Sequence, residues 1–223
     1  MLFQNRTHAG QRLARALVKY KARRPVVLAL PRGGVPVAAE VAAALAAPLD
    51  LVLVRKIGVP TQPELAMGAV TDGENATIIR NSEIIEFCGV DEREFDAVCN
   101  EELAEIERRR ERYLGERARA EVKGEVVIVV DDGIATGATI LAAVRAVRER
   151  KPKELVLAVP VAPLDTIEKL RAEVDDIVCL ETPGDLGAIG YFYRDFHQVS
   201  DEEVIATLKR FPTNRVEHAP DGS

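Results

Sequence analysis

The chain has 223 residues and a formal net charge of −6, with 36 acidic residues against 30 lysines and arginines. This acidic balance gives no electrostatic reason to expect binding to nucleic acid or to an anionic membrane. The most apolar run, residues 35–54, is broken by prolines and acidic residues and cannot span a membrane. Three cysteines without metal-ligand spacing favour a reducing compartment, so we expect a cytoplasmic protein with one buried core.

Hydrophobic periodicity predicts helices that alternate with short aliphatic strands. The expected strands cover residues 26–30, 50–54, 76–80, 126–130, 154–161 and 176–180. The expected helices cover residues 7–24, 35–47, 81–89, 91–120, 138–150, 164–172 and 200–211. Because strands keep alternating with helices, the pattern indicates an α/β fold built on a doubly wound parallel sheet.

A glycine-rich turn joins the first strand to the helix that follows it. The turn reads Pro31-Arg32-Gly33-Gly34. Paired glycines let the backbone approach an anion closely, and Arg32 adds a fork of donors that suits phosphate. A plain structural turn with a surface arginine is the alternative.

Two cations, Arg55 and Lys56, follow the strand predicted at residues 50–54. We expect them to lie beside the same turn, although adjacent cations on a protein surface are common. Residues 57–73 then show no hydrophobic period and contain five glycines and prolines. This composition predicts a mobile loop that can act as a lid.

The helix predicted at residues 91–120 is long and dense in charge. Its apolar residues share one stripe, formed by Phe95, Cys99, Leu103, Ile106 and Tyr113. Glu105 lies one turn before Arg109 and can pair with it. Two readings stay open. The helix is an inserted arm that packs over a site or a second subunit, with Arg108, Arg109 and Arg110 reaching a bound phosphate, or it presents a solvated charged face.

The most informative stretch follows the strand at residues 126–130, whose five aliphatic residues indicate burial on both faces. Asp131 and Asp132 come next, at the edge where open α/β sheets bind small molecules. Two adjacent acids there should cost stability in the empty protein. Small residues then lead into a helix and leave backbone N–H groups open to a phosphate. These residues are Ala135, Thr136, Gly137, Ala138 and Thr139.

Acceptors for hydroxyls beside donors for phosphate suit a sugar phosphate, and other phosphate motifs fit less well. A dinucleotide-binding turn needs G-x-G-x-x-G and an acid about 20 residues later, rather than two acids before the first glycine. The motif G-x-x-x-x-G-K-[ST] does not occur in the sequence. A purely structural turn, with the acids capping the helix, stays open, although capping needs only one acid.

A strand, two acids and a Thr-Gly-x-Thr turn resemble the signature of the type I phosphoribosyltransferases. The resemblance covers residues 26–180 and implies that Asp131 and Asp132 bind the ribose hydroxyls of phosphoribosyl pyrophosphate. It implies that residues 135–139 hold the 5-phosphate. The residues implied to hold the pyrophosphate are Arg32, Gly33, Gly34, Arg55 and Lys56. Mg²⁺ is the implied cofactor, held by substrate oxygens and water near the two acids.

The resemblance also implies an organisation for the chain. We expect one phosphoribosyltransferase-like domain over residues 1–212, with a helical insertion at 81–121, a hood at 181–212 and a disordered tail at 213–223. Members of the family close a flexible loop over the site, which excludes water. This sequence departs from the commoner patterns, because residues 58–77 contain no lysine or arginine.

The acceptor is the least defined part of the site. Members that use 6-oxopurines carry a basic residue near the end of the strand predicted at 154–161, and this sequence has none there. Residues 190–197 gather aromatic side chains beside Asp195. These rings either stack on a flat base or form a small core under the final helix.

The expected function is Mg²⁺-dependent transfer of a 5-phosphoribosyl group from phosphoribosyl pyrophosphate to an unidentified nitrogen acceptor, with a nucleobase as the favoured class. Catalysis would rest on positioning and electrostatics, with Arg32, Asp131 and Asp132 as the candidate catalytic residues. The rivals are a non-enzymatic regulator that senses phosphoribosyl pyrophosphate, and a related hydrolase or phosphorylase. Assembly into a homo-oligomer stays open.

Overall fold

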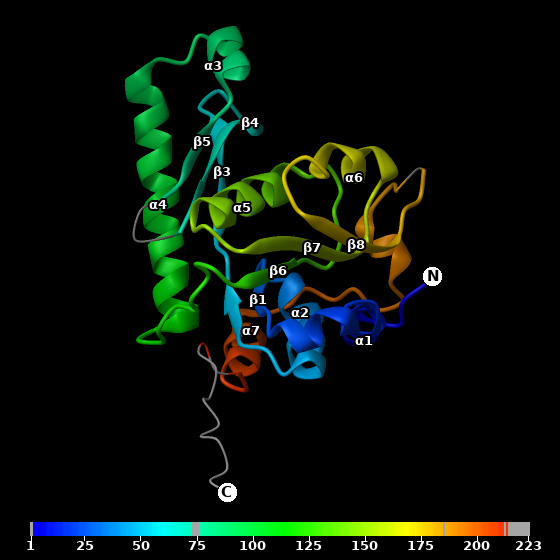
Figure 1. The fold of residues 1–223 in the computed structure, drawn as a ribbon. Coiled ribbons are helices and arrows are strands. Elements are labelled where there is room, and N and C mark those ends of the chain that lie inside the picture. The colour runs from blue at the N-terminus through cyan, green and yellow to red at the C-terminus, as the bar shows by residue number, and fades with distance from the viewer. Residues whose placement is uncertain (1, 73–75, 185, 212, 214–223) are drawn as a thin grey trace, which may run out of the picture.

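The computed structural model describes residues 2–72, 76–184, 186–211 and 213. Its centre is a five-stranded parallel sheet with the order β2-β1-β6-β7-β8 (Figure 1). The strands are β1 (Val26–Ala29), β2 (Leu49–Leu51), β6 (Val126–Val130), β7 (Glu154–Val161) and β8 (Asp176–Glu181). The predicted parallel sheet is therefore confirmed. Its strand order reverses between β1 and β6, which is the switch point where such sheets bind ligands.

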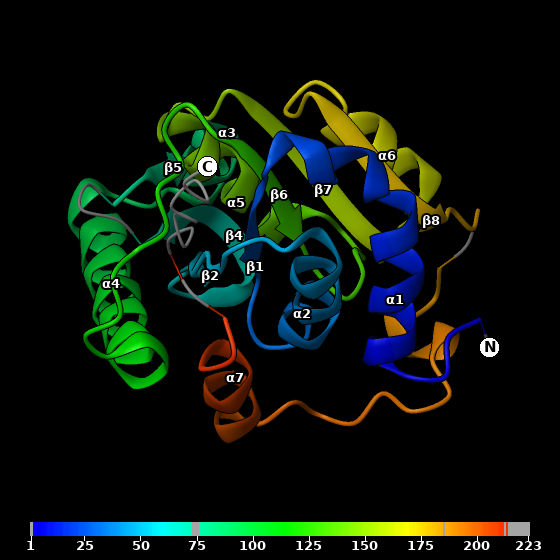
Figure 2. The same cartoon turned by 60° about the horizontal axis from the view of Figure 1, so that its bottom comes forward.

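Helices cover both faces of this sheet (Figures 1 and 2). One layer contains α1 (Arg6–Ala16), α2 (Gly34–Leu45) and α7 (Asp201–Leu208), and the other contains α5 (Ala138–Glu149) and α6 (Leu164–Leu170). In β1, Val27 and Ala29 face the first layer while Val26 and Leu28 face the second. This alternation is the period of two that a strand buried on both faces requires.

A second, antiparallel sheet follows β2 in the chain. Its strands are β3 (Val54–Val59), β4 (Gln62–Thr71) and β5 (Ile78–Arg80). The prediction of an irregular loop at residues 57–73 is therefore wrong for the part that the structure describes, and Gly73 lies outside that part. A Cβ on Gly58 would lie 2.4 Å from the Pro63 oxygen, and one on Gly68 would lie 2.5 Å from the Ile79 oxygen. These glycines serve close strand packing, although in the sequence they look like loop residues.

The long helix α4 (Glu92–Leu114) stands beside the second sheet and follows the short helix α3 (Ser82–Cys88) (Figure 1). Its predicted apolar stripe is confirmed, because Phe95, Cys99 and Ile106 are buried in the core of the same chain. The helix ends well before residue 120. Gly115 caps it, and the buried Asp50 carboxylate accepts the Ala120 N–H at 2.8 Å.

Other bounds differ mainly at element ends. The helix predicted at residues 7–24 divides into α1 and a 3-10 helix at Val18–Arg23. A capping box between Ser200 and Glu203 begins α7, which confirms the start of the helix predicted at residues 200–211. Most of the tail predicted at 213–223 lies outside the described residues.

A charge placed on the buried apolar stripe of α4 should destabilise the folded protein. We expect Ile106→Glu to lower the free energy of unfolding by about 3 kcal/mol or more, because the carboxylate would be buried without a partner. Asn100→Glu is the matched control, since Asn100 is exposed on the same helix. Urea unfolding measures both, and equal midpoints for the two variants would contradict the packing of α4 described here.

Candidate active site

The switch point brings together the two turns that the sequence singles out. β1 and β6 pair with Ala29 opposite Val130, and the Leu30 N–H donates to the Val130 carbonyl at 3.0 Å. Both strands end here, so residues 31–34 and 131–139 leave the sheet at the same edge. Two segments about one hundred residues apart in the sequence therefore form one place in the structure.

The paired glycines lie directly against the paired acids. A Cβ on Gly33 would lie 2.0 Å from Oδ2 of Asp132, and one on Gly34 would lie 2.9 Å from Cα of Asp131. Gly33 has an ordinary φ of −62°, so the site requires the absence of a side chain and not an unusual backbone conformation. The peptide bond between Pro31 and Arg32 is cis. The two glycines thus allow the turn to pack against the acids, in addition to any close approach to an anion.

Asp132 is buried in an ion pair that the sequence did not predict. Arg6 Nε donates to Asp132 Oδ2 at 2.7 Å, and Asp132 is only 8% exposed. The same guanidinium donates to the His197 carbonyl at 2.7 Å and lies 3.9 Å from the Phe196 ring centroid. Tyr193 donates its hydroxyl to the Asp132 carbonyl at 2.6 Å. Asp132 is therefore fixed from α1 and from the C-terminal segment together.

Asp131 has no such counterion among the described residues and remains partly exposed. Its Oδ1 accepts the Asp132 N–H at 2.8 Å. Burial, and next the neighbouring Asp132 charge, raise the pKa of Asp131 well above its usual range. Burial also raises the pKa of Asp132, while Arg6 opposes that shift. Of the two acids, Asp132 is thus the one that a counterion stabilises, through Arg6.

The predicted 5-phosphate loop lies at the start of α5. Gly137 caps the helix with a φ of 81°, a conformation that favours glycine. Ala135, Thr136, Ala138 and Thr139 are exposed around it. Within the described chain, the N–H groups of residues 135–139 donate no backbone hydrogen bond outside the helix itself. Open N–H groups at a helix start favour an anion.

The three predicted cations occupy different places. Arg32 points toward α7, with 3.6 Å between its NH1 and Asp201 Oδ1. Since β2 ends at Leu51, Arg55 and Lys56 lie within β3 and do not follow a parallel strand, which corrects that part of the prediction. Lys56 Nζ pairs with Glu64 at 3.2 Å.

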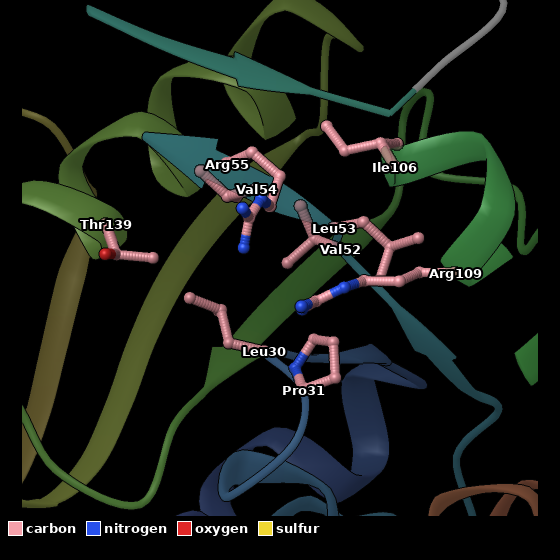
Figure 3. A pocket seen from close by; sticks show the side chains of 9 residues that line it. All are labelled: Leu30, Pro31, Val52, Leu53, Val54, Arg55, Ile106, Arg109 and Thr139. Carbon is pink, nitrogen blue, oxygen red and sulfur yellow. The ribbon is translucent and has the colours of Figure 1, made fainter. Parts of the chain in front are cut away.

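Arg55 lines a pocket between the two turns (Figure 3). Its wall includes Pro31 from the turn after β1, Thr139 from α5, and Arg109 from α4. The pocket therefore touches both loops that the family resemblance assigns to phosphates. Neither Arg32 nor Lys56 contributes to its lining.

The three consecutive arginines of α4 point in different directions. Arg109 lines the pocket and pairs with Glu105 at 2.7 Å, as the spacing predicted. Arg108 pairs with the same Glu105, but its side chain is 62% exposed and outside the pocket lining. Arg110 lies near Glu107 at 3.6 Å. Arg109 therefore lies at the pocket, whereas Arg108 lies on the solvated face of the helix.

The aromatic residues near the C-terminus form a small core. Tyr193 lies against Phe3 and Phe196, with ring centroids 5.2 Å and 4.9 Å away. The Phe192 side chain packs on the same cluster, whereas Tyr191 is 73% exposed. Of the two alternatives for residues 190–197, the structure shows the packed core.

Among the described residues, no group of three or more His, Cys, Asp or Glu side chains is placed to hold a metal ion. No helix in the described ranges is long and apolar enough to cross a membrane.

Comparison with known proteins identifies the family. Residues 2–194 match the phosphoribosyl transferase domain family. The chain therefore belongs to the phosphoribosyltransferases, as its acidic motif indicates. "Putative phosphoribosyl transferase Rv0571c" of Mycobacterium tuberculosis is 46% identical over 209 residues, which cover 94% of this chain and 47% of that protein. The chain thus spans about half the length of this curated relative.

A solved structure shows the same fold at similar identity. The crystal structure of the protein TT1426 from Thermus thermophilus is 42% identical, with a TM-score of 0.83. The match covers 95% of this chain and 100% of that one.

The contact between Gly33 and Asp132 makes a stability prediction. We expect Gly33→Ala to lower the free energy of unfolding by about 1–3 kcal/mol, because the new methyl group must displace the buried carboxylate. Gly184→Ala is the control, since a Cβ there meets nothing within 4 Å. Chemical denaturation compares them, and a Gly33→Ala protein as stable as the control would refute this contact.

The two acids should respond oppositely to neutralisation. Asp132→Asn leaves Arg6 buried and unpaired, so we expect a loss of about 3–5 kcal/mol in the free energy of unfolding. Asp131→Asn removes a poorly solvated charge beside another acid, so stability at neutral pH should stay equal or rise.

The stability difference between the wild type and Asp131→Asn should depend on pH. Because the folded-state pKa of Asp131 is raised, the wild type loses stability as pH rises from about 4, the usual aspartate value, through the raised value. Any advantage of Asp131→Asn should therefore shrink as the pH falls toward that usual value. Denaturant titrations at several pH values measure it, and a similar loss for both variants would contradict the assignment of separate roles.

Proposed function

We propose that this chain catalyses Mg²⁺-dependent transfer of a 5-phosphoribosyl group from phosphoribosyl pyrophosphate to a nitrogen acceptor, with a nucleobase as the favoured class. The observation that carries the proposal is the direct contact of Gly33 and Gly34 with Asp131 and Asp132. This contact places a turn suited to binding an anion directly beside two carboxylates that can accept hydrogen bonds from hydroxyl groups. Family membership supports the same ligand.

The ribose phosphate end is assigned to β6 and α5. Asp131 has no ion-pair partner among the described residues, so we assign its carboxylate to a ribose hydroxyl. Asp132 is held by Arg6, so we assign it the role of shaping the edge of the sheet against which the ribose would lie. The N–H groups of residues 135–139 would hold the 5-phosphate at the positive end of α5.

The pyrophosphate end is assigned to the turn after β1 and to the pocket beside it. Gly33 and Gly34 expose backbone close to the acids, and Arg55 places a guanidinium in the pocket. Arg32 would join them by leaving Asp201, from which it is separated by 3.6 Å. Lys56 lies farther along β3 and is assigned a supporting charge.

Mg²⁺ fits the residues present. The ion prefers oxygen ligands and keeps several waters, and it is commonly held by one or two carboxylates with substrate phosphates. Asp131 offers a carboxylate beside the phosphate loops that has no ion-pair partner in the described chain. When bound, the ion would neutralise charge on the pyrophosphate leaving group.

The proposed reaction needs no nucleophile from the protein. The bond between ribose C1 and the pyrophosphate oxygen breaks, and the oxygen keeps the bonding electrons. A C1–N bond forms to the acceptor, whose nitrogen gives up a proton to solvent. The carboxylates of Asp131 and Asp132 would lie near the cationic ring and favour its formation electrostatically.

A phosphoribosyl-pyrophosphate-sensing regulator is the second candidate, and one observation favours it. Tyr193 and Phe196, which could stack on a base, are instead packed against each other, and the Arg6 guanidinium covers the Phe196 ring. The end of β7 at Val161 and Ala162 is buried and apolar. A ligand site without an evident base platform suits binding without turnover.

The three cysteines are free in the structure, which supports the proposed reducing, cytoplasmic setting.

A screen of nucleobases tests the proposal. With phosphoribosyl pyrophosphate and Mg²⁺, we expect pyrophosphate release that depends on one base or a few related bases. Asp131→Asn should reduce kcat/KM by about tenfold to a hundredfold, because it loses a charge-assisted acceptor for a ribose hydroxyl. Calorimetric binding of phosphoribosyl pyrophosphate without release for any base would support the regulator, and release without a base would support a hydrolase.

A further inference from the structure

The pocket between the two phosphate turns receives a cation from α4. The segment that folds into β4 carries no lysine or arginine, since residues 58–77 contain none. Arg109 enters the pocket from α4 and extends toward the space that Arg55 enters from β3 (Figure 3). The helical insertion therefore supplies a positive charge that β4 lacks.

Both arginines are held in the same way. Arg55 Nε donates to Glu102 Oε2 at 2.5 Å, and Arg109 Nε donates to Glu105 Oε1 at 2.7 Å. Within the described chain, neither terminal nitrogen pair has a hydrogen-bond partner. The two side chains are 33% and 34% exposed. Each glutamate thus fixes the inner edge of a guanidinium and leaves its outer fork toward the pocket.

An outward fork is the edge that binds phosphate with two parallel hydrogen bonds. Glu102 and Glu105 also offset the repulsion that two nearby arginines would otherwise suffer. Hydrogen bonds from Arg108 and then Arg109 lower the pKa of Glu105 to about 2, so this support stays charged at any physiological pH. The pocket is preorganised for an anion and does not need to rearrange to receive it.

We propose that Arg109 is a pyrophosphate ligand, acting with Arg55 as a pair of guanidinium forks that α4 sets in place. Pro31 on the pocket wall belongs to the turn assigned to pyrophosphate, and Thr139 belongs to the loop assigned to the 5-phosphate. The diphosphate of a ligand seated on both turns lies next to this space. The inference rests on the proposed ligand and adds a residue from the insertion to its site.

Pyrophosphate binding tests the role of Arg109 directly. We expect Arg109→Ala to weaken binding of inorganic pyrophosphate with Mg²⁺ by about tenfold to a hundredfold, measured by isothermal titration calorimetry. Arg109→Lys should recover only part of the affinity, because lysine keeps the charge but loses the fork. Ribose 5-phosphate should bind all variants equally, since its phosphate is assigned to residues 135–139.

Arg108→Ala is a closely matched control. Arg108 adjoins Arg109 and donates two hydrogen bonds to the same Glu105, at 2.8 and 2.9 Å, but it does not line the pocket. We expect its removal to change pyrophosphate affinity by less than about twofold. Equal losses for Arg108→Ala and Arg109→Ala would overturn the inference, as would unchanged affinity in Arg109→Ala or an equal loss for ribose 5-phosphate.

Thermal unfolding of each variant separates binding from folding. If Arg109→Ala melts below the wild type, Arg109→Lys becomes the deciding variant. Wild-type pyrophosphate affinity in Arg109→Lys would then contradict binding by the guanidinium fork. The outcome is distinct from that of the base screen. Arg109-dependent pyrophosphate binding without turnover for any base keeps this inference and removes the transferase. Turnover in Arg109→Ala with wild-type kcat/KM and wild-type pyrophosphate affinity does the reverse.

Discussion

The buried ion pair between Arg6 and Asp132 joins three distant parts of the chain at the site. Arg6 belongs to α1, Asp132 follows β6, and the same guanidinium contacts the His197 carbonyl and the Phe196 ring of the C-terminal segment. Removing two charges from water costs several kcal/mol, which is recovered only when the geometry and the remaining hydrogen bonds are good. The position of the acids therefore depends on α1 and the C-terminal segment being seated, although neither belongs to the motif itself.

Each arginine of the candidate site has an acidic partner within the protein. Arg55 has Glu102, Arg109 has Glu105, and Arg32 has Asp201. The first two pairs use Nε and leave the guanidinium forks open, whereas the contact of Arg32 is a longer 3.6 Å approach of a terminal nitrogen. A phosphate ligand can thus bind Arg55 and Arg109 without breaking their support, but must compete with Asp201 for Arg32. This difference makes the pocket the preformed part of the anion site.

The parallel sheet and its two turns could be predicted from the sequence because their signals are local. A run of five aliphatic residues specifies β6, and the glycines and acids follow their strands directly. Residues 57–72 were misread because Gly58 and Gly68, which close strand packing requires, have the appearance of loop residues. Arg6 carries no local signal, since its partner is 126 residues away. The arginines of α4 differ only in direction, which the packing of the helix decides.

The aromatic residues near the C-terminus have a structural role in the site that their composition does not reveal. Tyr193 and Phe196 suggested a platform for a base, but both support Asp132. Phe196 packs against the Arg6 guanidinium, and Tyr193 donates a hydrogen bond to the Asp132 carbonyl. The buried end of β7 at Val161 offers no side-chain charge to an acceptor. In the proposed reaction, the acceptor would meet buried apolar residues at the end of β7, whereas the phosphates would meet the guanidinium groups of Arg55 and Arg109. The two ends of the proposed ligand would therefore be recognised differently, with charge pairing available to the phosphates and shape to the acceptor.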